Sequence, residues 1–394
     1  MRGIPATAVL FVVLTAFQLA AGPLAAAPPS VQEMVDGDPV PIGTVRSLHS
    51  DVLDEDRSLF VCLPDGYEGS SRSYPVLFVL YGDQVRGYFA EAVHTVNRLS
   101  GEGSIPQMVV VGVVNVDRYR DLSPVGRRGN PSGIGPFSRF VAEELLPFVE
   151  GEFRTKDYRI LVGPQAGAEF GLHTLATRPA LFNAFIVEDP FSVPETRDLL
   201  MPMLAGLIEE GPPSPTFLQV TWADRAGFAV RTGGAEGLRG FEKLVSDSGT
   251  PNLTLIVNYV ESSEDFLPPL LLKDGLRALF RGHRFPEDRE VKGLADITTH
   301  YDELSARLGF DVDVALMTLV GNASRLAQNG EADAAEEILD YLILTYPESL
   351  DGYWQLANLC REQGDNERAI ELYHKCLELM PNMRPAREWL DRLE

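Results

Sequence analysis

Short apolar runs alternate with amphipathic segments between residues 58 and 282. Seven runs predict strands, and several are continuously apolar and β-branched, which is typical of strands buried on both faces of a mostly parallel sheet. They read SLFVCL, PVLFVLY, MVVVGVV, RILVG, NAFIVE, TFLQVT and LTLIVNYV. Segments 135–153 and 233–249 place apolar residues at three- and four-residue steps and therefore predict helices. This alternation predicts an α/β fold whose pocket lies beyond the carboxyl ends of the strands.

The last part of the chain has a helical pattern with an internal repeat. Three pairs of residues stand 34 positions apart: Gly330 and Gly364, Ala335 and Ala369, and Pro347 and Pro381. That period, with a glycine between two helices, a small residue in the second helix and a closing proline, is the signature of tetratricopeptide repeats. We predict two such repeats and a capping helix over residues 316–394. Repeats of this kind present a concave surface to a protein or peptide partner.

The first 27 residues have the layout of a secretory signal peptide. Arg2 gives the positive end, an apolar run follows, and GPLAAAPPS supplies the small residues of a cleavage region. We expect a secreted or periplasmic protein with no membrane span after signal removal; the alternative is an uncleaved N-terminal membrane anchor. The predicted organisation is a signal peptide at 1–27, an α/β domain at 28–282, a helical linker at 283–315 and the repeats at 316–394.

Composition narrows the classes of partner. Apolar residues make up 45% of the chain and charged residues 23%, as in globular proteins. The formal net charge of −23 argues against nucleic-acid binding, because such a surface repels phosphate groups. Three cysteines are too few for a disulfide framework, and no spacing suggests a metal cluster. We therefore expect no cofactor and no metal site.

The stretch YRILVGPQAGAEFGLHTLATRP, residues 158–179, carries the candidate chemistry. An apolar strand runs through a small-residue turn into an apolar helix, which is how many hydrolases present a serine in the motif Gly-x-Ser-x-Gly. The outer glycines are Gly163 and Gly167, but the middle residue is Gln165, and the motif occurs nowhere else in the sequence. The pattern predicts an elbow without its nucleophile.

Further stretches, in order along the chain, resemble segments of one known family. They are LHSDVLDEDRSLFVCLPDGY, YPVLFVLYGDQ, VVVGVVNVDRYRDLSP, FSRFVAEELLPFVEGEFRTKDYRILVG, RPALFNAFIVEDP and HYDELSARLGF. The chain resembles the esterase D / enterochelin-esterase group of α/β-hydrolases, in the bacterial subset with C-terminal tetratricopeptide repeats, over residues 45–394. The resemblance implies an α/β-hydrolase fold followed by an all-α repeat segment.

In that family a Ser–Asp/Glu–His triad cleaves esters or thioesters. The resemblance places the serine at Gln165, whose amide is not a nucleophile, and the acid at Asp224. It places the histidine at Glu264, within one residue, and neither Ser263 nor Asp265 is a histidine. These degenerate triad positions leave no intact catalytic set.

The resemblance also implies groups that bind a substrate. Backbone N–H groups form the family's oxyanion hole, and they need no particular side chain. The matching positions are Gly82, Asp83, Gln84 and Ala166. Asn115, Arg118 and Arg120 follow a central predicted strand and have two interpretations: a polar wall of the cleft, or a structural cluster of ion pairs and hydrogen bonds. His173, on the helix after the elbow, is interpreted as a packing residue.

These residues support several functional hypotheses. The first is a secreted pseudo-esterase that binds a small carbonyl or carboxylate ligand or acts as a scaffold, with repeats that bind a protein. The alternative is a carboxylic-ester or thioester hydrolase with a rearranged active site. A third is a structural partner protein whose cleft is filled by side chains. Gln165, Asp224 and Glu264 would also bring two carboxylates into one pocket, which suits acid–base chemistry or calcium, although their spacing requires neither.

Overall fold

The computed structural model describes residues 41–82, 87–115, 117–126, 131–191, 193–225, 234–262 and 268–394. Residues 42–394 form one compact unit. The predicted signal peptide lies outside the described residues, and so do the predicted site residues Asp83, Gln84 and Glu264.

Eight strands of the described chain form one sheet in the order β1-β2-β4-β3-β5-β6-β7-β8. They are β1 (Thr44–Ser50), β2 (Glu55–Cys62), β3 (Tyr74–Leu80), β4 (Val109–Val113), β5 (Thr155–Pro164), β6 (Ala184–Glu188), β7 (Thr216–Arg225) and β8 (Leu253–Ser262). β2 is antiparallel to both of its neighbours, and all pairs from β4 to β8 are parallel. Every predicted strand is present. The mostly parallel sheet, with its helices, is the α/β-hydrolase fold, which confirms the predicted fold class.

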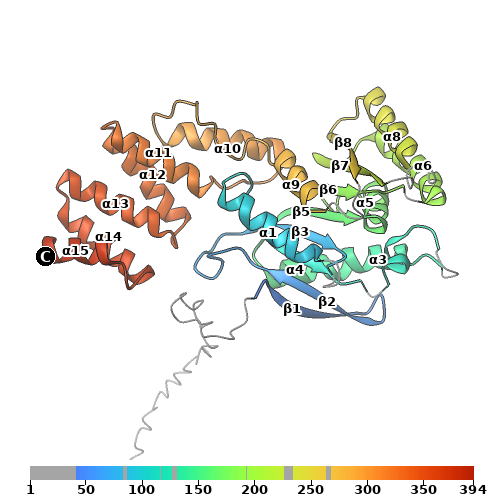
Figure 1. Ribbon diagram of the computed structural model, residues 1–394, viewed down its shortest axis with the longest axis horizontal. Helices are drawn as coiled ribbons and strands as arrows, with labels where there is room; N and C mark the ends of the chain where they lie inside the picture. The colour runs from blue at the N-terminus through green and yellow to red at the C-terminus, as the bar shows by residue number, and fades with distance from the viewer. Residues whose placement is uncertain are drawn as a thin grey trace, which may run out of the picture. The chain divides into compact units, whose positions relative to one another are not determined.

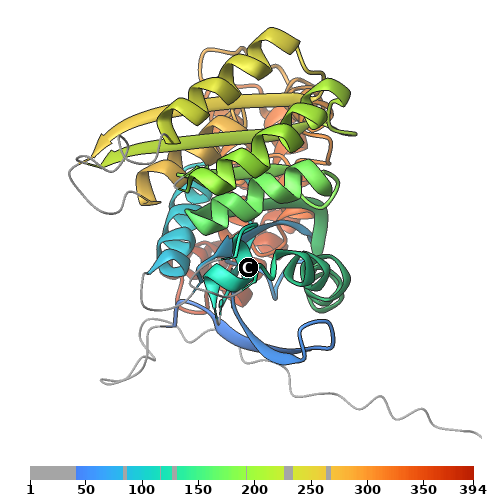
Figure 2. The same cartoon turned by 90° about the vertical axis from the view of Figure 1, so that its right-hand side faces the viewer.

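Helices cover both faces of the sheet (Figure 1). On one face α1 (Tyr88–Gly101) packs against β3 and β4, while α9 (Pro268–Leu279) packs against β6 and β7. On the other face α5 (Ala166–Thr177), α6 (Pro194–Glu210) and α8 (Gly234–Ser248) lie in a row, which Figure 2 shows in green to yellow. The helical layer that contains α5 continues through α2 (Arg118–Leu122), α3 (Ile134–Phe140), the π-helix η1 (Val141–Leu145) and α4 (Leu146–Glu152). The predicted helices at 135–153 and 233–249 are confirmed.

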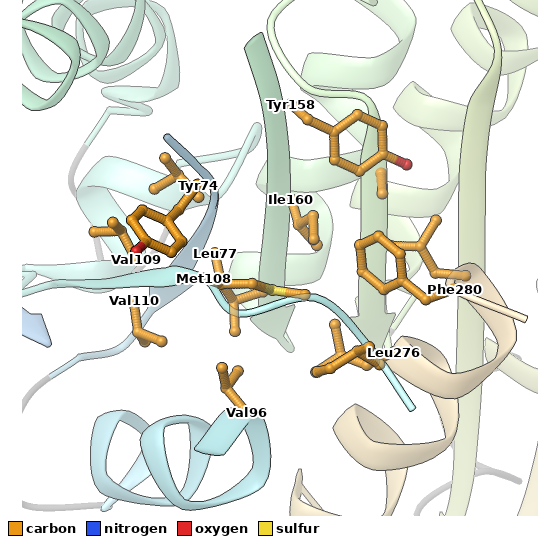
Figure 3. Close-up of a cluster of buried hydrophobic side chains, with 14 of the residues drawn as sticks. Tyr74, Leu77, Val96, Met108, Val109, Val110, Tyr158, Ile160, Leu276 and Phe280 are labelled. Carbon is orange, nitrogen blue, oxygen red and sulfur yellow. The ribbon is translucent and has the colours of Figure 1, made fainter. Parts of the chain in front are cut away.

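The strands are buried because apolar side chains from both neighbouring layers contact them. Figure 3 shows part of this core, where Leu77 of β3 and Ile160 of β5 lie close to Val96 of α1 and to Leu276 and Phe280 at α9. All of β3, β4 and β6 is buried. This burial accounts for their continuously apolar sequences, since neither face of these strands meets water.

The C-terminal segment is entirely helical in the described structure. After α10 (Leu294–Leu308) come two helical hairpins, α11 (Leu316–Gln328) with α12 (Ala332–Thr345) and α13 (Leu350–Gln363) with α14 (Asn366–Leu379), and then α15 (Arg384–Leu393). The second hairpin repeats the first after 34 residues. Gly330 and Gly364, in the turns, have φ of 84° and 87°, values that glycine adopts without strain. Within the described ranges, no helix combines the length and the apolar character needed to cross a membrane.

The helical segment shares its core with the α/β part. A continuous cluster of buried apolar residues extends from Leu59 to Leu390. At the junction the Tyr158 ring stacks on Phe310 with centroids 4.1 Å apart, and the Arg72 guanidinium lies 4.1 Å from the Tyr346 ring centroid. The two parts therefore pack as one body rather than as separate globules.

Candidate functional site

A single residue separates strand β5 from helix α5, and that residue is Gln165. Its backbone has φ 50° and ψ −114°, a strained conformation for a residue with a side chain. Two hydrogen bonds fix the turn: Gln165 N–H donates to the Glu188 carbonyl at 2.7 Å, and Glu169 N–H donates to the Gln165 carbonyl at 3.0 Å. The place and shape of this turn are those of a nucleophile elbow.

The glycine pair of the predicted motif serves close packing at the elbow. A Cβ added to Gly163 would lie 2.7 Å from the carbonyl carbon of Gly167. No real side chain tolerates that distance, so strand and helix meet this closely only with glycine at position 163. The motif therefore describes the backbone correctly, although its middle residue is an amide.

Of the other two triad positions, Asp224 lies at the same edge of the sheet as Gln165. Asp224 is the penultimate residue of β7, in register with Glu261 of β8, so it lies at the carboxyl end of a parallel strand, as Gln165 does. The described structure does not extend to the Asp224 side chain. Glu264 falls between the end of β8 at Ser262 and the start of α9 at Pro268, outside the described residues. The sequence of that connection contains no histidine.

The predicted oxyanion hole is described only in part. Gly82 N–H donates to the Val113 carbonyl at 3.0 Å, so this amide is already used within the sheet. Ala166 is the first residue of α5, where backbone N–H groups lack partners from a preceding turn. Beside it, Tyr81 has φ 62° and its backbone N–H donates to Asn115 Oδ1 at 3.2 Å. Burial raises the pKa of Tyr81 well above its ordinary value, and Arg118, 5.3 Å from its ring, opposes that shift.

The residues Asn115, Arg118 and Arg120 divide between two environments. Asn115 Nδ2 is buried and has no hydrogen-bond partner among the described residues, while the Arg118 guanidinium lies 5.3 Å from the Tyr81 ring centroid. Arg120 instead forms ion pairs with Asp121 and with Glu55, both at 2.7 Å. Asn115 and Arg118 therefore both contact Tyr81, whereas Arg120 belongs to an ion-pair cluster.

That cluster is centred on a fully buried arginine. Arg57 of β2 pairs with Asp121 at 2.9 Å and with Glu55, and its guanidinium lies 5.6 Å and 5.7 Å from the rings of Phe137 and Phe140. Because the cluster joins β2 to α2, it holds the helix that begins at Arg118, shortly after Asn115. Sequence reasoning did not identify Arg57, because it stands in a strand among exposed polar positions.

The sequence analysis also did not identify two acidic residues next to the elbow. Glu91 of α1 and Glu188 of β6 line, with Pro164 and Leu272, an apolar cavity of about 30 Å³, which is room for about one water molecule. Burial raises the pKa of Glu91, and its Oε2 has no hydrogen-bond partner in the described structure. The available signal was a glutamate within the apolar sequence YFAEAVHTV of an amphipathic helix.

Among the described residues, the histidines do not complete a Ser–Asp–His triad at the edge of the sheet that carries Gln165. His173 lies on α5, half-buried, and burial lowers its pKa. His94 is exposed on α1, and His283 is buried beside Gly103, near the opposite edge of the sheet. Among the residues that the structure describes, no group of three or more His, Cys, Asp and Glu side chains could hold a metal ion.

Comparison with known proteins finds similarity to esterases within the α/β part. Residues 50–229 match the family model Esterase, described as putative esterase. The ferri-bacillibactin esterase BesA of Bacillus subtilis is 28% identical over 137 residues, which are 30% of this chain and 47% of that protein. The chain spans about half to three fifths of the length of the curated relatives that it matches.

Solved structures share the fold. An IroE-like serine hydrolase from Shewanella oneidensis superposes with a TM-score of 0.64 at 24% identity, over 75% of this chain and 97% of that chain. An uncharacterised protein from Capnocytophaga ochracea superposes with a TM-score of 0.57 at 17% identity, over 89% of this chain and 99% of that one. Because this second superposition covers 89% of the chain, it extends beyond the α/β part. C-terminal helices therefore follow this fold in another solved structure as well.

Proposed function

We propose that this protein is a non-catalytic member of the esterase family, a secreted binding or scaffold module that has kept the elbow and lost the triad. The observation that carries the proposal is Gln165 at the tip of the elbow. A glutamine amide has no nucleophilic oxygen of useful basicity and no proton to transfer to a base. The absence of any histidine between β8 and α9 removes the base at the same site.

The groups that remain near Gln165 favour binding of a small carbonyl or carboxylate ligand. Asn115 Nδ2 is a buried donor without a partner among the described residues, and the Arg118 guanidinium lies on the neighbouring tyrosine. Both offer N–H groups to an oxygen acceptor. Such donors stabilise a polarised carbonyl in an esterase and bind a carboxylate equally well where no nucleophile is present.

The helical hairpins support a second binding surface. Their 34-residue period and their turn glycines agree with tetratricopeptide repeats, and we propose that α11 to α14 bind a protein or peptide partner. The predicted signal peptide would place this interaction outside the cytoplasm. In this proposal the esterase-fold part holds a ligand or serves as a platform, and the hairpins connect it to a partner.

The competing function is a carboxylic-ester or thioester hydrolase with a rearranged site, and hydrolysis of p-nitrophenyl acetate separates the two. The mature wild-type chain and Gln165→Ala should both match a heat-denatured control. Gln165→Ser should recover almost nothing, because a lone hydroxyl is a weak nucleophile without a base. In a serine protease, loss of the triad lowers turnover by about a million-fold. Against so low a starting rate, even a slight recovery of hydrolysis in a variant is measurable.

The double variant Gln165→Ser with Glu264→His tests whether the pocket is still suited to the old chemistry. We expect more than the sum of the two single variants, since in this proposal Asp224, near the carboxyl end of β7, orients the new imidazole. Saturable turnover by the wild type, blocked by a serine-directed phosphonate, would overturn the proposal. Full activity of Gln165→Ser alone would show that a base is already present.

A further inference from the structure

A cavity of about 430 Å³ lies at the edge of the sheet opposite to Gln165. One wall comes from the amino ends of the central strands: Tyr74 begins β3, Lys156 follows the first residue of β5, and Gln107 precedes β4. The other wall comes from the helical segment, at the start of α11 and in the connection from α12 to α13, which contains Glu348. Volumes of this size accommodate small molecules.

The charged side chains of this cavity are paired with one another. Arg72 Nη2 donates to Glu348 Oε1 and to Gln107 Oε1, both at 2.9 Å. Lys156 Nζ lies 2.9 Å from Asp313 Oδ1. A further carboxylate of the wall, Asp65, is exposed to solvent. The buried part of the cavity therefore carries no unbalanced charge, and this favours a neutral occupant.

Two buried acceptor atoms in the wall lack partners among the described residues. His283 Nδ1 lies 3.0 Å from the Gly103 carbonyl, which can only accept, so Nδ1 carries the proton and Nε2 has a free lone pair. Burial lowers the pKa of His283 to about 4, so the ring is neutral at physiological pH. His283 Nε2 and Glu348 Oε2 are both buried without a hydrogen bond. Leaving a buried acceptor without a donor is unfavourable, so both atoms indicate a ligand that donates.

We propose that this cavity binds a neutral, hydroxyl-rich small molecule the size of a monosaccharide or cyclitol. Its hydroxyl groups would donate to His283 Nε2 and Glu348 Oε2, while Ile105, Leu316 and Met317 supply apolar surface for its carbon skeleton. A second hollow of about 340 Å³ shares Gly101, Gly103 and Met317 with the cavity and offers a route of entry. The site does not depend on the chemistry proposed for the elbow. Because both parts of the chain line the cavity, its ligand would also stabilise their junction.

The test measures binding of myo-inositol and D-glucose to the full mature chain by saturation-transfer NMR titration, with putrescine and gluconate as charged probes. Gly101→Phe narrows the cavity, since a Cβ at Gly101 meets no atom within 4 Å and the residue lines both hollows. Gly151→Phe is the matched control, because Gly151 is another exposed glycine near a helix end with nothing within 4 Å of its Cβ, and it does not line the cavity.

We expect saturable binding of at least one neutral polyol to the wild type and to Gly151→Phe, weakened by about tenfold or more in Gly101→Phe. His283→Phe should weaken it by about three- to tenfold, because it removes one acceptor; if that variant does not fold, Gly101→Phe decides. The proposal is overturned if neither polyol binds saturably, if Gly101→Phe binds like the wild type, or if the charged probes bind as tightly as the polyols.

Discussion

At the scale of single residues, the backbone of Gln165 is strained without a visible catalytic reason. A non-glycine residue held at φ 50° and ψ −114° carries about 1–3 kcal/mol of backbone strain. Active sites normally retain such strain because it holds a nucleophile in position. The strain persists here because two backbone hydrogen bonds and the contact between Gly163 and Gly167 define the turn. The elbow geometry is thus a property of the fold, separable from the chemistry of its side chain.

This separation gives a prediction for stability. Gln165→Gly should raise the free energy of unfolding by about 1 kcal/mol, because glycine adopts this conformation without strain and its greater entropy in the unfolded chain offsets part of the gain. Gln165→Ala should leave stability nearly unchanged, since alanine is strained in the same way. Urea unfolding of the three proteins measures the difference. A glycine variant less stable than the alanine variant would show that the turn is not strained.

At the scale of elements, the cluster around Arg57 connects the β1–β2 hairpin to α2 and so positions Asn115 and Arg118. Asp121→Asn should destabilise the protein by about 3 kcal/mol, because it leaves the fully buried Arg57 without one of its two carboxylates. Arg120→Met should cost about 1 kcal/mol or less, since its side chain is 38% exposed and such pairs contribute little. Chemical denaturation of the wild type and of both variants measures these losses of stability. Equal losses would contradict the distinction between the buried and the exposed arginine.

The elements differ in how far the sequence could predict them. The strands and both helical hairpins could be predicted, because burial on two faces and a 34-residue repeat leave local patterns in the chain. The Gly163–Gly167 motif likewise predicted the elbow, since its glycines are demanded by local backbone geometry. The sequence marks Glu91 as a charged residue within an apolar helical segment but does not place it at a cavity, because that cavity is completed by Leu271 and Leu272, far along the chain. Patterns within one element carry no information about such neighbours.

At the scale of the whole molecule, the same reasoning explains why the residues of the junction could not be predicted. Arg72 donates to Glu348, 276 residues later, and its guanidinium lies 4.1 Å from the Tyr346 ring centroid. Tyr158 stacks on Phe310 across the same boundary. The sequence suggested an α/β domain, a linker and repeats as successive units. The contacts tie the helical hairpins to the amino ends of the central strands, so the stabilities of the two parts should be coupled.

The three tryptophans allow a direct measurement of this coupling, because Trp222 lies on β7 whereas Trp354 and Trp389 lie on α13 and α15. In a chain carrying Trp354→Phe and Trp389→Phe, fluorescence reports only on the α/β part, and far-UV circular dichroism reports on the whole. We expect the two urea transitions to coincide, as they do when a chain unfolds in one cooperative step.

Arg72→Ala in the chain without Trp354 and Trp389 should separate the two transitions, because it removes the ion pair and the ring contact that join the parts. Arg98→Ala, which removes an exposed pair with Glu102 within the α/β part, should leave them coincident. Separate transitions before any junction mutation would mean that the helical hairpins fold independently of the α/β part.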